Sequence, residues 1–282
     1  MFDHMVRLGL FVVFLIAAAA AAANAAETKP PPVIPPDQIY TTLSVVTGSD
    51  ERNRPLGFRL CFEDVLVKAS GDATVLADRR VPALAAKAGG YIDTFSYFDR
   101  LFGRPLHDEQ GSYDRPHYLT CHFNPGKIDN VLASLGRKTW KGARPKLAML
   151  LTVHGRKTSG VLAADGDFDP DMREALGNAA QRYGMVVVLP ATEMLRANGI
   201  TVDAGTKTLR AKALPIAKVA GGDVPLIGDL TFSDKAGGWI ARWHIDVQGR
   251  DVAWSASGIN YDEAFRVAVR GAMRALSGNG RP

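Results

Sequence analysis

The order of apolar and polar positions predicts a small α+β unit in the first half of the chain. Three segments rich in β-branched or aromatic residues predict strands at 40–46, 91–98 and 118–123. Apolar residues at helical spacing predict helices at 55–69, 81–88 and 125–135. Gly71 follows the first of these helices as a stop signal. We therefore expect an N-terminal α+β domain at residues 40–136.

A composition break at 136–145 separates this unit from a second pattern. The near-continuous apolar run at 147–153 predicts a strand that is covered on both faces. Asp169 and Pro170 open a helix that Gly184 ends, and the apolar run at 185–189 follows. Strand, helix and strand at this spacing predict a βαβ unit with parallel strands.

The last third of the chain predicts a three-stranded antiparallel meander and a final helix. The strands are expected at 224–232, 239–247 and 252–257, and the amphipathic helix at 261–276. Two short helices, at 192–197 and 206–212, precede the meander. The expected fold is therefore mixed α+β and α/β, with a C-terminal α/β domain at 145–277 and a disordered tail at 278–282.

The turn between the last two strands sets their register. If Gly249 and Arg250 form it, Val247 faces Val252. Ile245 then faces Trp254, and Trp243 faces Ala256, all on the apolar side of the ribbon. Trp239 has the same parity, so the three tryptophans are expected in the core rather than on a sugar-stacking surface.

Several segments form a recognisable set: Leu-Cys-Phe-Glu-Asp-Val-Leu-Val-Lys-Ala-Ser-Gly at 60–71, Tyr91 before an aromatic strand, Trp140 with Arg144-Pro145-Lys146-Leu147, and residues 184–190, which end in Leu189-Pro190. Together they resemble a family of secreted proteobacterial proteins, the domain of unknown function numbered 2066. The resemblance implies an envelope protein of Gram-negative bacteria with no established activity, so it transfers no catalytic residue. Its second half is also similar to small α/β domains of outer-membrane and flagellar accessory proteins, at the level of fold alone.

The N-terminal sequence is typical of an export signal. Arg7 precedes an apolar run at 8–23, and Ala23-Asn24-Ala25 fits the small-x-small pattern of a cleavage site. We expect a signal peptide at 1–25, a proline-rich linker at 26–39 and a periplasmic mature protein with no transmembrane segment. The alternative is an uncleaved signal that anchors the protein in the inner membrane.

Charge adds one candidate surface. The 282 residues carry a formal net charge of +5, and export argues against a nucleic-acid partner. The densest basic run, within 137–146, contains Arg137, Lys138, Lys141, Arg144 and Lys146, with Trp140 among them. It is either a solvated loop or a surface that binds an anionic envelope polymer.

Two cysteines would face an oxidising compartment if the protein is exported. Cys61 falls in a predicted helix, and Cys121 lies on the expected buried face of a strand. An even count in such a compartment predicts a disulfide. The alternative is two separate buried thiols, which behave as small hydrophobic side chains.

Candidate catalytic and metal sites fail their sequence tests. Asp165, Asp167, Asp169 and Asp171 alternate, but Pro170 and Leu176 stand where an EF-hand needs glycine and glutamate. His117 and Cys121 share one strand face while His122 points away from it, so we expect no metal. Neither a nucleophile elbow nor a phosphate-binding loop is present, and Ser159-Gly160 is interpreted as a loop. We expect no cofactor and no catalytic residue.

The resulting hypothesis is a non-enzymatic accessory or binding module of the cell envelope, with an envelope protein as its partner. One alternative is a hydrolase with an unrecognised site near His154, because strand ends in α/β sheets often border ligand crevices. The other is the polymer binder that uses Trp140 and the basic run. The sequence leaves the oligomeric state open.

Overall fold

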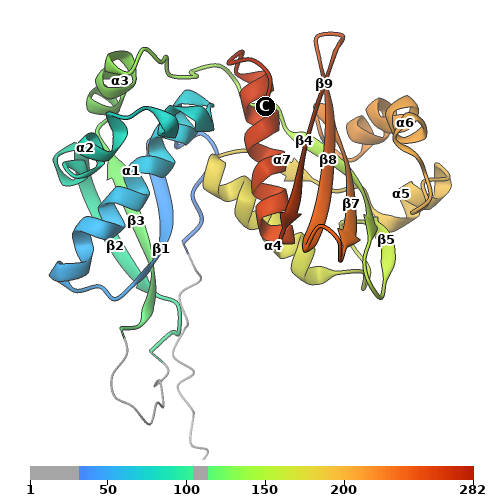
Figure 1. The fold of residues 1–282 in the computed structure, drawn as a ribbon, viewed down its shortest axis with the longest axis horizontal. Helices are drawn as coiled ribbons and strands as arrows, with labels where there is room; N and C mark the ends of the chain where they lie inside the picture. Colours follow the sequence, from blue (N-terminus) through green and yellow to red (C-terminus); the bar gives the residue numbers. More distant parts are fainter. Residues whose placement is uncertain (1–31, 104–113) are drawn as a thin grey trace, which may run out of the picture. The chain divides into compact units, whose positions relative to one another are not determined.

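The computed structural model of this protein describes residues 32–103 and 114–282 (Figure 1). The predicted signal peptide and the first part of the linker lie outside the described residues. The described chain contains a three-stranded sheet and a six-stranded sheet, together with helices, which confirms the expected α+β architecture.

The first sheet is antiparallel, in the order β1-β3-β2. Its strands are β1 (Thr41–Thr47), β2 (Ile92–Asp99) and β3 (Pro116–Phe123). The helices of this half are α1 (Arg54–Ser70), α2 (Val81–Ala85) and α3 (Pro125–Ser134), with short 3-10 turns between them. As predicted, Gly71 ends α1 with a left-handed backbone, at φ 72°.

The second sheet has the order β5-β4-β7-β8-β9, with β4 (Leu147–His154) next to the edge strand β5 and β6 also paired to β4. Its other strands are β5 (Ser159–Leu162), β6 (Val187–Val188), β7 (Val224–Ser233), β8 (Gly238–Val247) and β9 (Arg250–Ile259). Its helices are α4 (Pro170–Tyr183), α5 (Thr192–Ala197), α6 (Thr206–Val219) and α7 (Tyr261–Leu276). Strands β6 and β7 run parallel to β4, and β8 and β9 complete the antiparallel meander.

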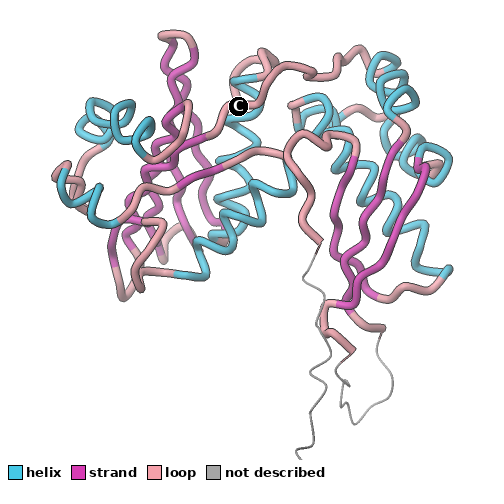
Figure 2. The backbone as a smooth tube through the Cα atoms, turned by 180° about the vertical axis from the view of Figure 1, so that it is seen from behind, coloured by secondary structure: helices cyan, strands magenta, loops and turns pink. Residues whose placement is uncertain are grey.

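Helices cover both faces of the second sheet. Helices α4 and α7 lie on one side, and α5 and α6 on the other, in both views (Figures 1 and 2). The side under α4 and α7 buries Leu147 and Trp243, and the side under α6 buries Leu150 and Ile227. A strand can bury alternate residues on both faces only when both are covered, which explains the continuous apolar sequence of β4.

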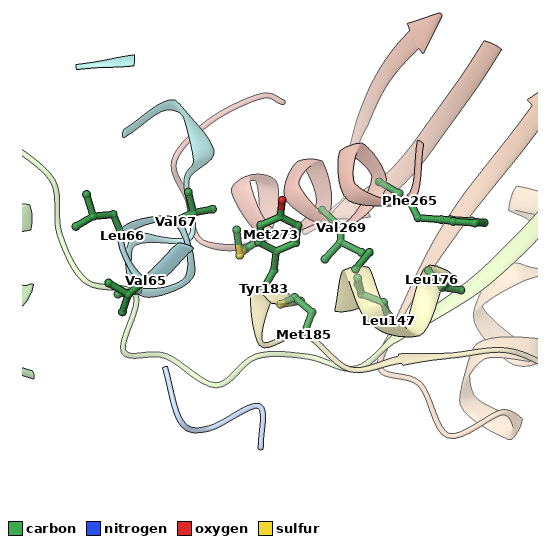
Figure 3. Packing of buried hydrophobic residues seen from close by; sticks show 14 of the residues in the cluster. Val65, Leu66, Val67, Leu147, Leu176, Tyr183, Met185, Phe265, Val269 and Met273 are labelled. Carbon is green, nitrogen blue, oxygen red and sulfur yellow. The ribbon is translucent and has the colours of Figure 1, made fainter. Parts of the chain in front are cut away.

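One buried cluster includes residues from both halves of the chain. Val65, Leu66 and Val67 of α1 belong to it together with Tyr183 of α4 and Met273 of α7 (Figure 3). The domain boundaries expected from the sequence, 40–136 and 145–277, stay a prediction. None of the described helices is long and apolar enough to cross a membrane.

The structure corrects several expected elements. Residues 159–162 form strand β5 rather than a loop, because the chain turns back after β4 and Gly155 donates to the Thr158 carbonyl. The strand expected at 185–189 is reduced to the two residues of β6, and β7 is the longer parallel neighbour of β4. Helix α2 ends three residues early, at Ala85, and α6 continues past 212 to Val219.

The register of the β8–β9 hairpin also differs. Val247 pairs with Arg250, Ile245 with Val252, and Trp243 with Trp254. The turn is therefore Gln248-Gly249, both with positive φ, rather than Gly249-Arg250. A shift of two residues leaves every side chain on its expected face, so Trp243 is still fully buried.

Candidate functional site

Cys61 of α1 and Cys121 of β3 form a disulfide, as one of the two sequence hypotheses expects. Their Cα atoms are 6.3 Å apart, and neither side chain is exposed. The bond fixes α1 on the first sheet across a sequence separation of 60 residues. Disulfides of this buried kind are typical of proteins from oxidising compartments.

The basic run at 137–146 is largely occupied by contacts within the chain. Arg137 Nη1 donates to Oδ2 of the fully buried Asp72 at 2.9 Å, and Lys141 Nζ lies 3.0 Å from Asp129 Oδ2. Arg144 donates to the main-chain carbonyls of residues 68 and 183. A cation that is already paired has less free energy to gain from an anionic polymer.

Trp140, the aromatic residue within this run, packs against the core. The ring is half-buried against the main core, and the Arg144 guanidinium lies 4.5 Å from its centroid. The Trp140 amide donates to the Ala69 carbonyl at the end of α1, which holds the ring there. Lys138 and Lys146 remain exposed. Polymer binding through this run stays a prediction that the ion pairs do not favour.

His154 ends β4 on the face of the second sheet that α6 covers. Its Nε2 atom lies 3.6 Å from Oδ2 of Asp229 on β7. Arg242 of β8 donates to the other oxygen of Asp229 at 3.0 Å. Thr152 and Thr231 donate to Asp229 as well, each at 3.2 Å. Asp229 is therefore the acceptor at the centre of a polar cluster.

This cluster arises from strand pairing. Thr152 lies opposite Asp229, and Asp229 lies opposite Arg242, so three neighbouring strands place one polar row across the sheet. The sequence indicated His154 as a candidate because of its place at a strand end, whereas Asp229 and Arg242 were not among the expected site residues. The available signal was a polar residue at every second position: 152 and 154, 229 and 231, and 242 and 244.

The cluster borders a hollow of about 390 Å³ at the N-terminal end of α6. Among the described residues that line it, hydroxyl groups come only from Thr152 and Thr206, and the Thr152 hydroxyl is bound to Asp229. Nucleophilic catalysis needs a hydroxyl or thiol within hydrogen-bond reach of the base. The arrangement can orient His154, but it does not pair it with a free nucleophile.

A larger hollow, of about 750 Å³, runs along α6 above β7 and β8. Apolar side chains make up much of its lining, with Leu214, Val224 and Ile227 among them, and charged residues stand at its rim. Of those, Arg210 pairs with Asp251 at 3.0 Å, and Asp223 accepts from the Lys146 amide. Hollows of this size accommodate small-molecule ligands.

No group of three or more metal-binding side chains comes together in residues 32–103 and 114–282. The alternating aspartates instead serve local structure. Asp169 accepts from the Met172 amide and caps α4, and Asp165 accepts from the amide and hydroxyl of Thr192.

Comparison with known proteins corrects the family resemblance. Residues 36–141 match the family model described as Domain of unknown function (DUF8605). That region contains the 60–71 segment, Tyr91 and Trp140, and the family whose model matches it is not the one numbered 2066. The match runs from the linker before β1 to just past α3 and says nothing about activity.

A search of curated proteins finds no match. Among solved structures, the chain is similar to the competence or damage-inducible protein from Enterobacter asburiae, at 13% sequence identity. The alignment covers 55% of this chain and 94% of that one, with a TM-score of 0.28. At that score the similarity carries no conclusion about fold or function.

Proposed function

We propose that this protein is exported and acts in the cell envelope as a non-enzymatic binding or accessory module. The observation that carries the proposal is the buried Cys61–Cys121 disulfide. It accounts for both cysteines of the chain, and such a bond persists in compartments that do not reduce it. The sequence of residues 1–25 supports the same conclusion.

Binding is favoured over catalysis by the state of Asp229. Three donors already occupy this carboxylate, and none of them is a nucleophile placed for attack. Asp229 can orient His154, but no hydroxyl among the described residues that line the hollow donates a hydrogen bond to His154. The hollow beside α6, by contrast, has the size and apolar character of a binding site.

The test is mass spectrometry of the protein purified from the envelope of its own host, with thiol alkylation before and after reduction. We expect a mass that begins near Ala26 and no alkylation until the sample is reduced. A mass that begins at Met1 with two free thiols would overturn the proposal. An intact Met1 with a closed bridge in the membrane fraction would instead support the anchored form.

A hydrolase at His154 is the second candidate, because the imidazole lies 3.6 Å from a carboxylate. Its test is a panel of ester, amide and phosphoester substrates with the wild type, His154→Ala and Asp229→Asn. Turnover that disappears in both variants while their folds are retained would establish the enzyme. Turnover that persists in His154→Ala would exclude this site as its source.

A further inference from the structure

Strand β1 is an edge of the first sheet, because the sheet order is β1-β3-β2. Its pairing with β3 determines which main-chain groups point outward. Phe123 donates to the Tyr40 carbonyl and Gly48 donates to the Arg115 carbonyl, so the even-numbered residues of this segment face β3. The amides and carbonyls of Thr41, Leu43, Val45 and Thr47 therefore face the free edge.

Thr41 confirms this direction, because its outward groups have partners. Its amide donates to the Gln38 carbonyl, and its carbonyl accepts from Lys68 Nζ at 3.0 Å. The outward amides and carbonyls of Leu43 and Val45 have no hydrogen-bond partner in the described part of the chain. Two consecutive outward-facing residues thus present two donors and two acceptors in the spacing of a β ladder.

These groups open on a hollow of about 600 Å³. It is lined by Leu43, Ser44 and Val45 of β1 and by Glu174, Asn178 and Arg182 of α4. Pro32 and Val33 of the linker line it as well, and the Pro32 carbonyl accepts from Gln181 Nε2. An exposed edge strand normally faces open solvent or is covered by the fold. Here it lines a hollow to which helix α4 also contributes.

The charges of the hollow indicate what an added strand would carry. Arg182 is paired with Asp64, and Arg266 is paired with Glu263. Arg266 shares Glu263 with Arg270. Within residues 32–103 and 114–282, Glu174 and Asp262 of the lining have no ion-pair partner, and neither has Arg100, whose guanidinium lies 4.9 Å from the ring centroid of Tyr118 on β3. The two unpaired carboxylates therefore stand on the α4 and α7 side, where they complement a lysine or arginine, and the unpaired cation stands on the side of the first sheet.

We propose that the β1 edge binds an extended peptide of a partner protein as an added strand, with a basic side chain directed to Glu174 and Asp262. Main-chain hydrogen bonds to Leu43 and Val45 would supply affinity, and the two unpaired carboxylates would supply preference. The inference rests on the proposed function, because it names the partner chemistry of a binding module.

The first probe is the fluorescein-labelled peptide acetyl-Thr-Val-Lys-Val-Lys-Val-Thr-amide, measured by fluorescence polarisation with the full mature chain. Two control peptides are isomers of each other that carry N-methyl groups on alternate main-chain amides. In one isomer the methylated amides lie along one edge of the extended peptide, and in the other isomer they lie along the opposite edge. We expect one isomer to bind about tenfold more weakly and the other to bind like the parent, because only one edge faces β1. Equal binding of both isomers would overturn the proposal, as would no binding at about 1 mM.

The second experiment changes the edge strand β1 of the protein. Val45→Pro removes an outward amide that the sheet does not use, and proline is tolerated at such positions of edge strands. We expect the peptide to bind about fivefold more weakly, equivalent to about 1 kcal/mol. Val45→Thr keeps the amide and is the matched control. Circular dichroism verifies the fold of both variants, and unchanged affinity in a folded Val45→Pro would contradict the edge site.

The contribution of the two carboxylates to peptide binding is tested with the double variant Glu174→Gln/Asp262→Asn. The control is Glu193→Gln, which removes a carboxylate on α5. We expect the double variant to weaken binding and to flatten its salt dependence, and the control to do neither. Sedimentation of the protein without peptide measures its oligomeric state and so tests whether a second copy of the chain occupies the β1 edge. A dimer that Val45→Pro abolishes would show that a second copy fills the edge, which would overturn the peptide proposal.

Failure of this inference is distinguishable from failure of the proposed function. A photo-crosslinker is placed at residue 45 and, separately, at residue 214 beside α6, in protein expressed in its own host. A partner captured from 214 but not from 45, with the disulfide closed, would retain the exported binding module and overturn the β1 site. Free thiols would count against the proposed function itself.

Discussion

Arg182 of α4 donates two hydrogen bonds to the same oxygen of Asp64 on α1, from Nε at 2.9 Å and from Nη2 at 2.7 Å. Ser44 of β1 donates to the other oxygen at 3.4 Å. The Asp64 side chain is nearly buried, whereas Arg182 is 42% exposed. Burial raises the pKa of Asp64, and the neighbouring guanidinium opposes that rise. The pair joins the first helix to a helix of the second sheet.

We predict that Asp64→Ala lowers the free energy of unfolding by about 2 kcal/mol. This is less than the ~3–5 kcal/mol typical of breaking a fully buried pair, because Arg182 can recover water contacts. Asp64→Asn keeps the shape and an acceptor, so we expect about half that loss. Urea unfolding of the three proteins measures both effects. Equal stability of the wild type and Asp64→Ala would show that the pair contributes nothing.

Lys68 predicts a pH dependence of stability. Its side chain is 1% exposed, and burial, with a smaller contribution from the charge of Arg144, lowers its pKa to about 8. An unfolded lysine titrates near 10.5, so between about pH 8 and 10.5 the unfolded chain binds more protons than the folded one. Stability contributed by this group should therefore rise with pH across that window, by at most about 3 kcal/mol.

The measurement is urea unfolding of the wild type and Lys68→Met at several pH values from 7.5 to 10. Methionine retains much of the length of the side chain but does not titrate. We expect the stability of the wild type to increase relative to Lys68→Met as the pH rises. A difference between the two proteins that stays constant over this range would show that Lys68 titrates normally in the folded protein.

The sequence pattern predicts faces better than it predicts partners. Trp243 and Trp254 were expected on the buried side of β8 and β9, and that side was right even though the register was two residues off. Parity survives a shift of two residues because the side-chain period of a strand is two. The sequence could not supply the turn at Gln248 and Gly249, which depends on two positive φ angles.

Partners that lie far apart in the sequence explain the remaining differences. Arg137 and Lys141 look like a free basic surface until Asp72 and Asp129 are placed beside them. Local composition contains no information on such pairings. His154 was found because a strand end is a local feature, whereas Asp229 joins it only through the pairing of β4 with β7.

Removing the disulfide should be costly. The loop between Cys61 and Cys121 spans 60 residues, and loop-closure entropy for that length gives about 4 kcal/mol. We predict that reductant lowers the free energy of unfolding of the wild type by about this amount. Cys61→Ala/Cys121→Ala is the control, since reductant should leave its stability unchanged. A loss below about 1 kcal/mol would indicate that the reduced chain keeps the loop closed by other contacts.

The β8–β9 turn offers a stabilising substitution. Gln248 has φ 55° and Gly249 has φ 77°, and the Gly249 amide donates to Asp246 Oδ1 at 2.8 Å. Two positive φ angles define a type I′ turn, in which Asn-Gly is strongly preferred over other pairs. We predict that Gln248→Asn raises the free energy of unfolding by about 0.5 kcal/mol, because asparagine tolerates the left-handed region. Gly249→Ala should lower it by about 1 kcal/mol, since alanine adds a Cβ there. Gln248→Ala is the matched control and should not stabilise the protein. Urea unfolding measures the stability of each variant. If Gln248→Asn is no more stable than Gln248→Ala, the assignment of this turn is contradicted.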